Sequence, residues 1–146
     1  MAKKEPKVKK VYLNSSETGD EIPLLYTNVS AGFPSPAEDF FQEGLDLNAH
    51  LIKHPASTFF VKVEGDSMIN AGIFPDDILI VDRSIKPEEN KIVIASLNGE
   101  LIVKRLERKK GKLYLKPENN KFEPIPINEE SDLRIWGVVI YTIHKT

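Results

Sequence analysis

Residues 91–106 read KIVIASLNGELIVKRL, two apolar runs joined by Asn98-Gly99. Asn-Gly between two apolar runs predicts a β-hairpin, because both central residues of a type I′ turn need a positive φ. The paired strands are expected over 91–97 and 100–106. This stretch therefore predicts a domain built on antiparallel β-strands.

The strand pattern continues on both sides of this hairpin. Phe59, Val61 and Val63 alternate with Lys62 and Glu64, which is the period of a half-buried strand. Uninterrupted apolar runs typical of buried strands occur elsewhere, and prolines and glycines mostly lie between the runs. The further strands expected cover residues 59–63, 78–81, 113–115 and 136–143.

Little helix is expected. Ser35-Pro36 resembles a helix start, with serine as the N-cap and proline at the first helical position, and Gly44 would end that helix. A second short helix is predicted over 46–52, before Pro55. The sequence therefore predicts a mostly β fold with a small helical content.

The first 31 residues differ in composition from the rest of the chain. Five of the first ten residues are lysines, and a polar stretch follows them. We interpret 1–31 as a flexible N-terminal arm and 32–146 as the folded domain. Within the arm, only 11–13 and 22–26 have the apolar residues to pair as a short strand.

Composition excludes several classes of protein. The chain has 146 residues, the size of one domain, with 20 basic and 22 acidic residues and no cysteine. This charge balance argues against binding nucleic acid through bulk charge. The lack of cysteine excludes disulfides, thiol catalysis and cysteine-ligated metals. No apolar run could span a bilayer, and no secretory signal follows the lysines, so a cytoplasmic location is expected.

Two histidines have the spacing of zinc ligands on a helix. His50 and His54 are four residues apart, but no glutamate stands beside His50, as a metalloprotease motif requires. Pro55 follows directly and is expected to end the helix. We interpret both as surface histidines, and no metal site or cofactor is predicted.

Ser67 is a candidate nucleophile. It lies in Glu64-Gly65-Asp66-Ser67-Met68, directly after the 59–63 strand. Glycine at a strand end allows a sharp turn, which can expose the hydroxyl and aim backbone N–H groups at one point. The alternative is an ordinary turn whose polar side chains bond their own backbone, and the local sequence alone favours that alternative.

The position of Lys104 makes the interpretation of Ser67 as a nucleophile more favourable. Its neighbours on one strand face are Ile102 and Leu106, so it points to an apolar surface. Desolvation there disfavours the ammonium and lowers the pKa, the condition under which lysine acts as a general base for a serine. The alternative is a lysine that extends to water at a sheet edge. These residues alone leave both interpretations open.

Three motifs together resemble the LexA-like self-cleaving peptidases with a Ser-Lys dyad, and within them the UmuD group. They are GDSM at 65–68, DILIVD at 77–82 and VKRL at 103–106. The similarity extends over about residues 29–143, the whole predicted domain. It implies a β-rich, LexA/UmuD-like peptidase fold.

The resemblance also implies roles for four residues. Ser67 would be the nucleophile and Lys104 the general base, and the bond between Ala31 and Gly32 would be cut. Small residues suit a scissile bond, since the arm must lie extended across the site with its carbonyl carbon near Ser67.

The partners implied by the resemblance belong to the SOS response. They are a second copy of the chain in a homodimer, a RecA filament on single-stranded DNA that stimulates cleavage, and a Y-family, UmuC-like polymerase subunit for translesion synthesis. Two alternatives stay open: a non-cleaving polymerase accessory or binding module, and a LexA-type transcriptional regulator. The absence of an upstream helix-turn-helix counts against the regulator, and no sequence-specific DNA binding is expected.

Overall fold

The computed structural model describes residues 7–13, 22–25 and 41–146. The chain divides into two compact units. One unit comprises Met1–Asn14 and Ala56–Thr146, and the other is Ser15–Pro55. The first of these contains Ser67 and Lys104, the candidate nucleophile and base.

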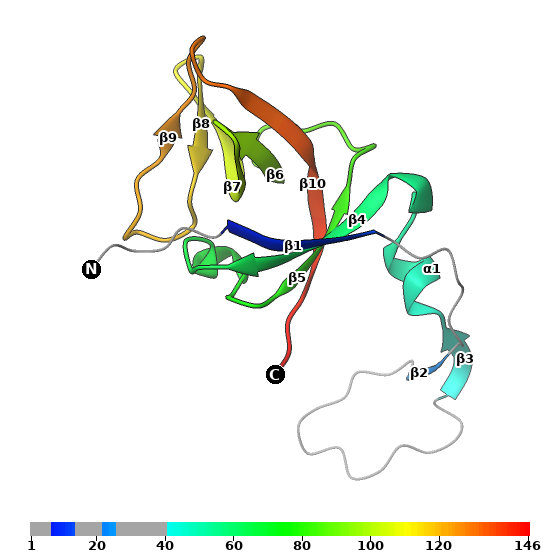
Figure 1. Ribbon diagram of the computed structural model, residues 1–146. Coiled ribbons are helices and arrows are strands. Elements are labelled where there is room, and N and C mark those ends of the chain that lie inside the picture. The colour runs from blue at the N-terminus through cyan, green and yellow to red at the C-terminus, as the bar shows by residue number, and fades with distance from the viewer. Residues whose placement is uncertain (1–6, 14–21, 26–40) are drawn as a thin grey trace. The chain divides into compact units, whose positions relative to one another are not determined.

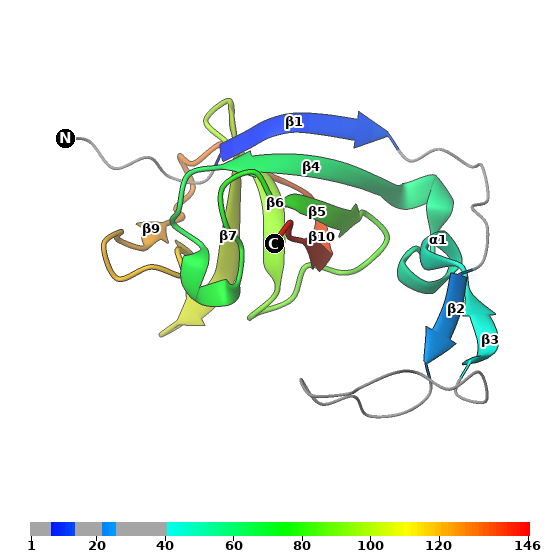
Figure 2. The ribbon, with the colours of Figure 1, turned by 90° about the horizontal axis from the view of Figure 1, so that it is seen from below.

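The first unit is an antiparallel sheet in which β1 closes a ring of strands. The strand order is β1-β4-β5-β10-β6-β7-β8-β9, and β1 also pairs with β7 (Figures 1 and 2). The predicted mostly β fold is therefore confirmed. The strands are β1 (Lys7–Leu13), β4 (Thr58–Glu64), β5 (Ile78–Asp82), β6 (Ile92–Leu97), β7 (Glu100–Lys109), β8 (Lys112–Lys116), β9 (Ile125–Pro126) and β10 (Leu133–Ile143).

The predicted hairpin joins β6 to β7. Asn98 and Gly99 have φ values of 49° and 88°, and Leu97 pairs with Glu100. Both central residues thus occupy the left-handed region that a type I′ turn requires. β7 then runs on to Lys109, beyond the predicted end, because β8 pairs with its second half.

Strand β1 is longer than the 11–13 segment that the sequence indicated. It pairs with β4 from Lys7 to Leu13, with a register shift between Val8 and Lys10. Main-chain hydrogen bonds hold a strand whatever its side chains are, so Lys7, Lys9 and Lys10 within β1 do not prevent pairing. The β-propensity of residues 7–10 was therefore a poor guide to their structure.

The second unit corrects one prediction. β2 (Ile22–Leu25) pairs antiparallel with β3 (Phe41–Leu45), and Gly44 lies opposite Pro23 within that pair. Gly44 as the end of a helix is therefore wrong, since pairing with a distant segment overrides the local signal. The helix start predicted at Ser35-Pro36 lies outside the described residues.

The predicted helix over 46–52 is confirmed as α1 (Leu47–Leu51). Asp46 is its N-cap and accepts a hydrogen bond from the Ala49 N–H at 3.3 Å. A single 3₁₀ turn, Pro55–Ser57, then leads into β4. These residues carry the chain from the second unit to the first.

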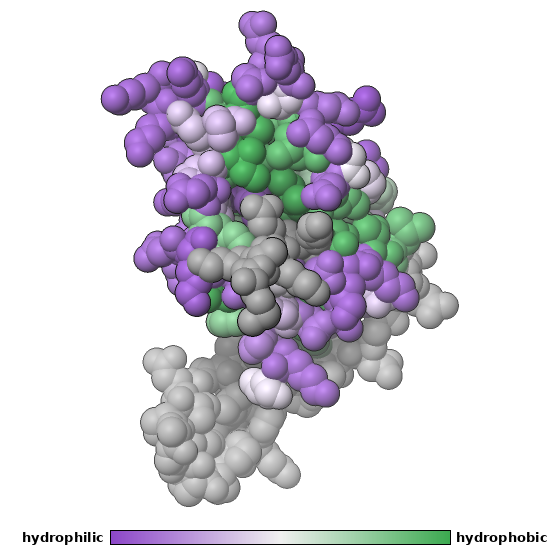
Figure 3. Space-filling model, turned by 60° about the vertical axis from the view of Figure 1, so that its left-hand side comes forward, coloured by the Kyte–Doolittle hydropathy of each residue, from purple (hydrophilic) through white to green (hydrophobic). Residues whose placement is uncertain are grey.

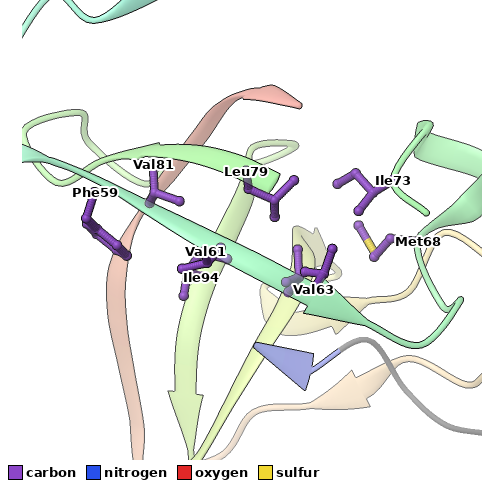
Figure 4. Close-up of a cluster of buried hydrophobic side chains, with 9 residues drawn as sticks. Phe59, Val61, Val63, Met68, Ile73, Leu79, Val81 and Ile94 are labelled. Atoms are coloured by element: carbon purple, nitrogen blue, oxygen red, sulfur yellow. The ribbon is translucent and has the colours of Figure 1, made fainter. Parts of the chain in front are cut away.

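The core of the sheet consists of two hydrophobic clusters. β6 contributes Ile94 to the first cluster and Val93 and Ala95 to the second, so both of its faces are buried. The first cluster, most of which Figure 4 shows, comprises Phe59, Val61, Val63, Met68, Ile73, Leu79, Val81, Ile94 and Val103. The second comprises Val93, Ala95, Ile102, Leu106, Leu115 and Val138.

Apolar side chains also reach the surface of the sheet. On the face that carries β8 and β9, a hydrophobic area is bordered by hydrophilic side chains (Figure 3). Partly buried residues that pack against the second cluster include Leu113, Ile125 and Ile127, which lie on or beside these two strands. β8 and β9 thus extend the second cluster outward from the closed ring of strands.

Candidate active site

Ser67 and Lys104 meet inside the first unit. The Lys104 Nζ donates a hydrogen bond to the Ser67 Oγ at 2.9 Å, across 37 positions of sequence. Both residues have a relative exposure of 0%. A serine hydroxyl and a lysine amine therefore share a site that excludes bulk water.

The turn after β4 places Ser67. Gly65 has a φ of 85°, a conformation that favours glycine, and it turns the chain out of the strand. Met68 lies on the other side of Ser67 and is buried in the first cluster beside Val63 and Ile73 (Figure 4). A glycine turn and a buried methionine thus fix the serine between them.

The backbone after Ser67 is tightly folded. The Met68 carbonyl accepts hydrogen bonds from the N–H groups of Ala71 at 3.0 Å and Ile73 at 3.2 Å. A 3₁₀ turn, Ile69–Ala71, continues from Met68. The segment that carries the nucleophile is therefore an ordered turn anchored in the core.

Strand β7 places Lys104. The residue pairs with Val93 of β6, and Ile102 and Leu106 flank it on its own face with exposures of 3% each. The whole side chain is buried, so the alternative of a lysine that extends to water is wrong. Lys104 lies in the sheet interior, as the prediction of an apolar strand face required.

Burial determines the acid–base character of this lysine. A low-dielectric environment disfavours the ammonium form, so we expect burial to lower the pKa of Lys104 from its ordinary value. At 2.9 Å the pair can be bonded in either direction. The charged amine donates to the Ser67 oxygen, whereas the neutral amine accepts the Ser67 proton.

One residue near the site was missed by the sequence analysis. Asn119, 7% exposed, donates from its Nδ2 to the Asp66 carbonyl at 2.9 Å. It lies 53 positions from Asp66, in a polar turn whose composition gives no sign of such a contact. Only a long-range contact distinguishes it from Asn120, its exposed neighbour.

The other residues considered from sequence lie elsewhere or outside the described chain. Ala31 and Gly32 are outside it. His50 lies in α1 and His54 follows it, and both are exposed. In residues 7–13, 22–25 and 41–146, no three acidic or histidine side chains gather as metal ligands would. No helix in these ranges has the length and apolarity needed to cross a membrane.

Comparison with known proteins identifies the family. Residues 23–140 match the family described as Peptidase S24-like, and these residues include both Ser67 and Lys104. The chain belongs to the Peptidase S24-like family. Membership supports a self-cleaving protein of the serine-peptidase type in general.

Curated relatives narrow this assignment within the family. SamA of Salmonella typhimurium is 46% identical over 124 residues, 85% of this chain and 86% of SamA. ImpA of Escherichia coli is 43% identical over 130 residues, 85% of this chain and 84% of ImpA. The LexA repressor of Hahella chejuensis is 34% identical over 136 residues, 92% of this chain and 68% of the repressor. The chain is thus a UmuD-like member of the Peptidase S24-like family, among proteins related to the SOS response.

Proposed function

We propose that this protein is a self-cleaving serine peptidase of the SOS response, which cuts its own N-terminal arm between Ala31 and Gly32. Ser67 is the nucleophile and Lys104 the general base. The observation that carries the proposal is the 2.9 Å contact between these two fully buried side chains. Cleavage separates the arm, 1–31, from the domain, 32–146.

The proposed chemistry uses Lys104 for proton transfer in both the formation and the hydrolysis of the acyl-enzyme. Neutral Lys104 takes the Ser67 proton as the Oγ attacks the Ala31 carbonyl carbon, and backbone N–H groups around Ser67 stabilise the oxyanion. The Lys104 ammonium then protonates the Gly32 amine as it leaves. Water, activated by the same amine, hydrolyses the acyl-enzyme and restores Ser67.

Burial makes it chemically reasonable that Lys104 acts as the general base. In water, lysine titrates near ~10.4, so only about one molecule in 2,500 is neutral at pH 7. Desolvation of Lys104 raises that neutral fraction. The substrate segment belongs to the same chain or to a second copy, so the scissile bond is held beside Ser67 and does not have to reach it by diffusion. Each chain is cut only once, so a fast reaction is not required.

The proposed setting is the bacterial cytoplasm. The protein acts as a homodimer, a RecA filament on single-stranded DNA stimulates cleavage, and the shortened product joins a Y-family, UmuC-like polymerase subunit in translesion synthesis. Similarity to the SOS-related UmuD-like proteins supports these partners.

Mass spectrometry of the purified protein tests the proposal. After incubation at alkaline pH, or with RecA, nucleotide and single-stranded DNA, we expect fragments 1–31 and 32–146. Ser67→Ala should leave the chain intact, whereas Ser96→Ala, a serine of β6 outside the dyad, should be cut like the wild type.

Three outcomes would contradict this proposal in different ways. A product that begins at a residue other than Gly32 contradicts the scissile bond. Cleavage of the Ser67→Ala chain contradicts the nucleophile. A folded wild-type chain that stays intact under both conditions favours the alternative of a non-cleaving accessory module.

A further inference from the structure

The backbone just before Ser67 is held by a side chain from another part of the chain. Asn119, in the turn that follows β8, donates from its Nδ2 to the Asp66 carbonyl oxygen at 2.9 Å. The amide is 7% exposed, so water competes little for this bond. The contact holds the carbonyl one residue ahead of the proposed nucleophile.

The held carbonyl shares a peptide unit with the Ser67 N–H. A trans peptide is planar, and its C=O and N–H point in opposite directions. Among the residues that the structure describes, no peptide bond is cis. A bond that fixes the Asp66 carbonyl therefore also fixes the direction in which the Ser67 N–H points.

The Asn119 amide is itself fixed in orientation. Its Oδ1 accepts a hydrogen bond from the Lys121 N–H at 3.0 Å. An N–H donor must face the amide oxygen, so the NH₂ group is the part that faces Asp66. The two contacts together select one rotamer of the amide.

Glu118, the residue before Asn119, holds the other end of the turn that carries Ser67. The Glu118 carbonyl accepts from the Asn70 N–H at 2.8 Å, and the Glu118 carboxylate pairs with the Arg105 Nε at 2.5 Å. Arg105 directly follows Lys104 on β7. Glu118 and Asn119 thus hold the turn that carries Ser67 at two points, Asp66 and Asn70. The pair between Glu118 and Arg105 links this turn to β7, the strand that carries Lys104.

We propose that Asn119 is a positioning residue for self-cleavage: it holds the Asp66–Ser67 peptide so that the Ser67 N–H donates to the developing oxyanion. This inference rests on the proposed function. Asn119 takes no part in proton transfer between Ser67 and Lys104. Its loss should therefore slow the reaction without changing the titration of the base.

The first test compares cleavage rates across pH for two variants of Asn119 and a matched control. Asn119→Ala removes both amide contacts, whereas Asn119→Asp keeps an acceptor for the Lys121 N–H but has no amide proton to donate. Both should lower the plateau rate by about 10- to 100-fold, less than or equal to the loss of an oxyanion donor itself. Asn120→Ala, an exposed neighbour of the same type, should cleave at the wild-type rate.

The pH profile separates positioning from a general structural role. In Asn119→Ala the plateau should fall while the pH midpoint stays within a few tenths of a unit, because Lys104 remains buried. If Asn119→Asp reaches the wild-type plateau, the Lys121 contact explains any loss in Asn119→Ala, and the inference is wrong. A shifted midpoint with an unchanged plateau also overturns it.

A second readout does not depend on cleavage. The amide ¹H–¹⁵N signal of Ser67 is sensitive to the hydrogen bond on the preceding carbonyl, so it should move in Asn119→Ala and stay in Asn120→Ala. If the wild type never cleaves but this signal moves, the proposed function fails and the contact stands. If the wild type cleaves and Asn119→Ala matches its rate at every pH, the proposed function stands and the inference fails.

Discussion

At the scale of single residues, Lys104 is a lysine buried completely in the sheet interior. A lysine with 0% exposure has no water to solvate an ammonium, and isolated buried charges are avoided in proteins by a shift of pKa. Its Nζ donates a hydrogen bond to the Ser67 Oγ at 2.9 Å. Burial by itself therefore disfavours the charged form of this lysine and favours the neutral form.

The rate of self-cleavage should depend on pH through Lys104. Because only the neutral amine accepts the Ser67 proton, the rate of the free protein should fall about tenfold for each pH unit below the pKa of Lys104 and level off above it. Lys104→Arg should be inactive at every pH at which it stays folded, since guanidinium keeps its proton. Lys112→Arg, on the exposed start of β8, should keep the wild-type profile. A flat profile or an active Lys104→Arg chain would show that another group is the base.

At the scale of elements, β10 packs closely against β5 at Gly137. β10 pairs with both β5 and β6 and changes register between Ile135 and Gly137 and again between Val139 and Tyr141. A Cβ on Gly137 would lie 2.7 Å from the Val81 side chain and 3.1 Å from the Asp82 carbonyl oxygen. The small residue at this position therefore serves packing between neighbouring strands.

Gly137→Ala should destabilise the fold. The added methyl overlaps Val81 and the backbone of Asp82, and overpacking of this kind costs about 1–3 kcal/mol. Urea denaturation measures the cost. In a double-mutant cycle with Val81→Ala, the double variant should lose less stability than the sum of the single ones, because truncation relieves the closer contact. An additive cycle would show that Val81 is not the obstacle.

At the scale of the whole molecule, the arm contributes a strand to the sheet. β1 pairs with β4 and also with β7, and both Figure 1 and Figure 2 show it alongside β4. Val8 packs against the first cluster, and Lys9 pairs with Asp76 at 3.1 Å in an exposed position. Exposed ion pairs contribute little, at most about 1 kcal/mol, so main-chain bonds and Val8 hold β1.

Cleavage at Ala31-Gly32 should therefore weaken the sheet. Before the cut, the tether keeps β1 at a high effective concentration, on the order of millimolar, and afterwards the fragment 1–31 is free to dissociate. At micromolar protein, thermal unfolding of the cut chain should occur a few degrees below that of the uncut Ser67→Ala chain. An excess of a synthetic 1–31 peptide should restore most of the difference.

Two substitutions in β1 test whether this strand stabilises the sheet, without cleavage of the chain. Val8→Asp in the uncut Ser67→Ala chain should lower the unfolding temperature, because it places a charge against the first cluster. Leu13→Asp is the matched control, since Leu13 is 87% exposed and should not change it. Equal unfolding temperatures for the cut and uncut chains, with no effect of the peptide, would mean that β1 does not stabilise the sheet.

Local signals in the sequence predicted most of the sheet. The hairpin at Asn98-Gly99, α1 with its Asp46 cap, and the apolar runs that became β4, β5, β6 and β10 all depend on residues that are close in sequence. Gly44 failed as a helix end because its strand is determined by pairing with β2. β1 was underestimated for the same reason, since its partners lie about 50 and 95 residues away.

The sequence by itself determined the antiparallel β fold, the family resemblance, and the two residue types that the proposed reaction needs. Each follows from a local pattern: a turn dipeptide, a period of two, a glycine two residues before a serine, or a lysine on an apolar strand face. Only the tertiary structure decided that Ser67 and Lys104 meet at 2.9 Å in a site without bulk water, and that Asn119 holds the adjacent carbonyl. Contact and burial are properties of segments that are distant in the chain, and they arise when the sheet closes.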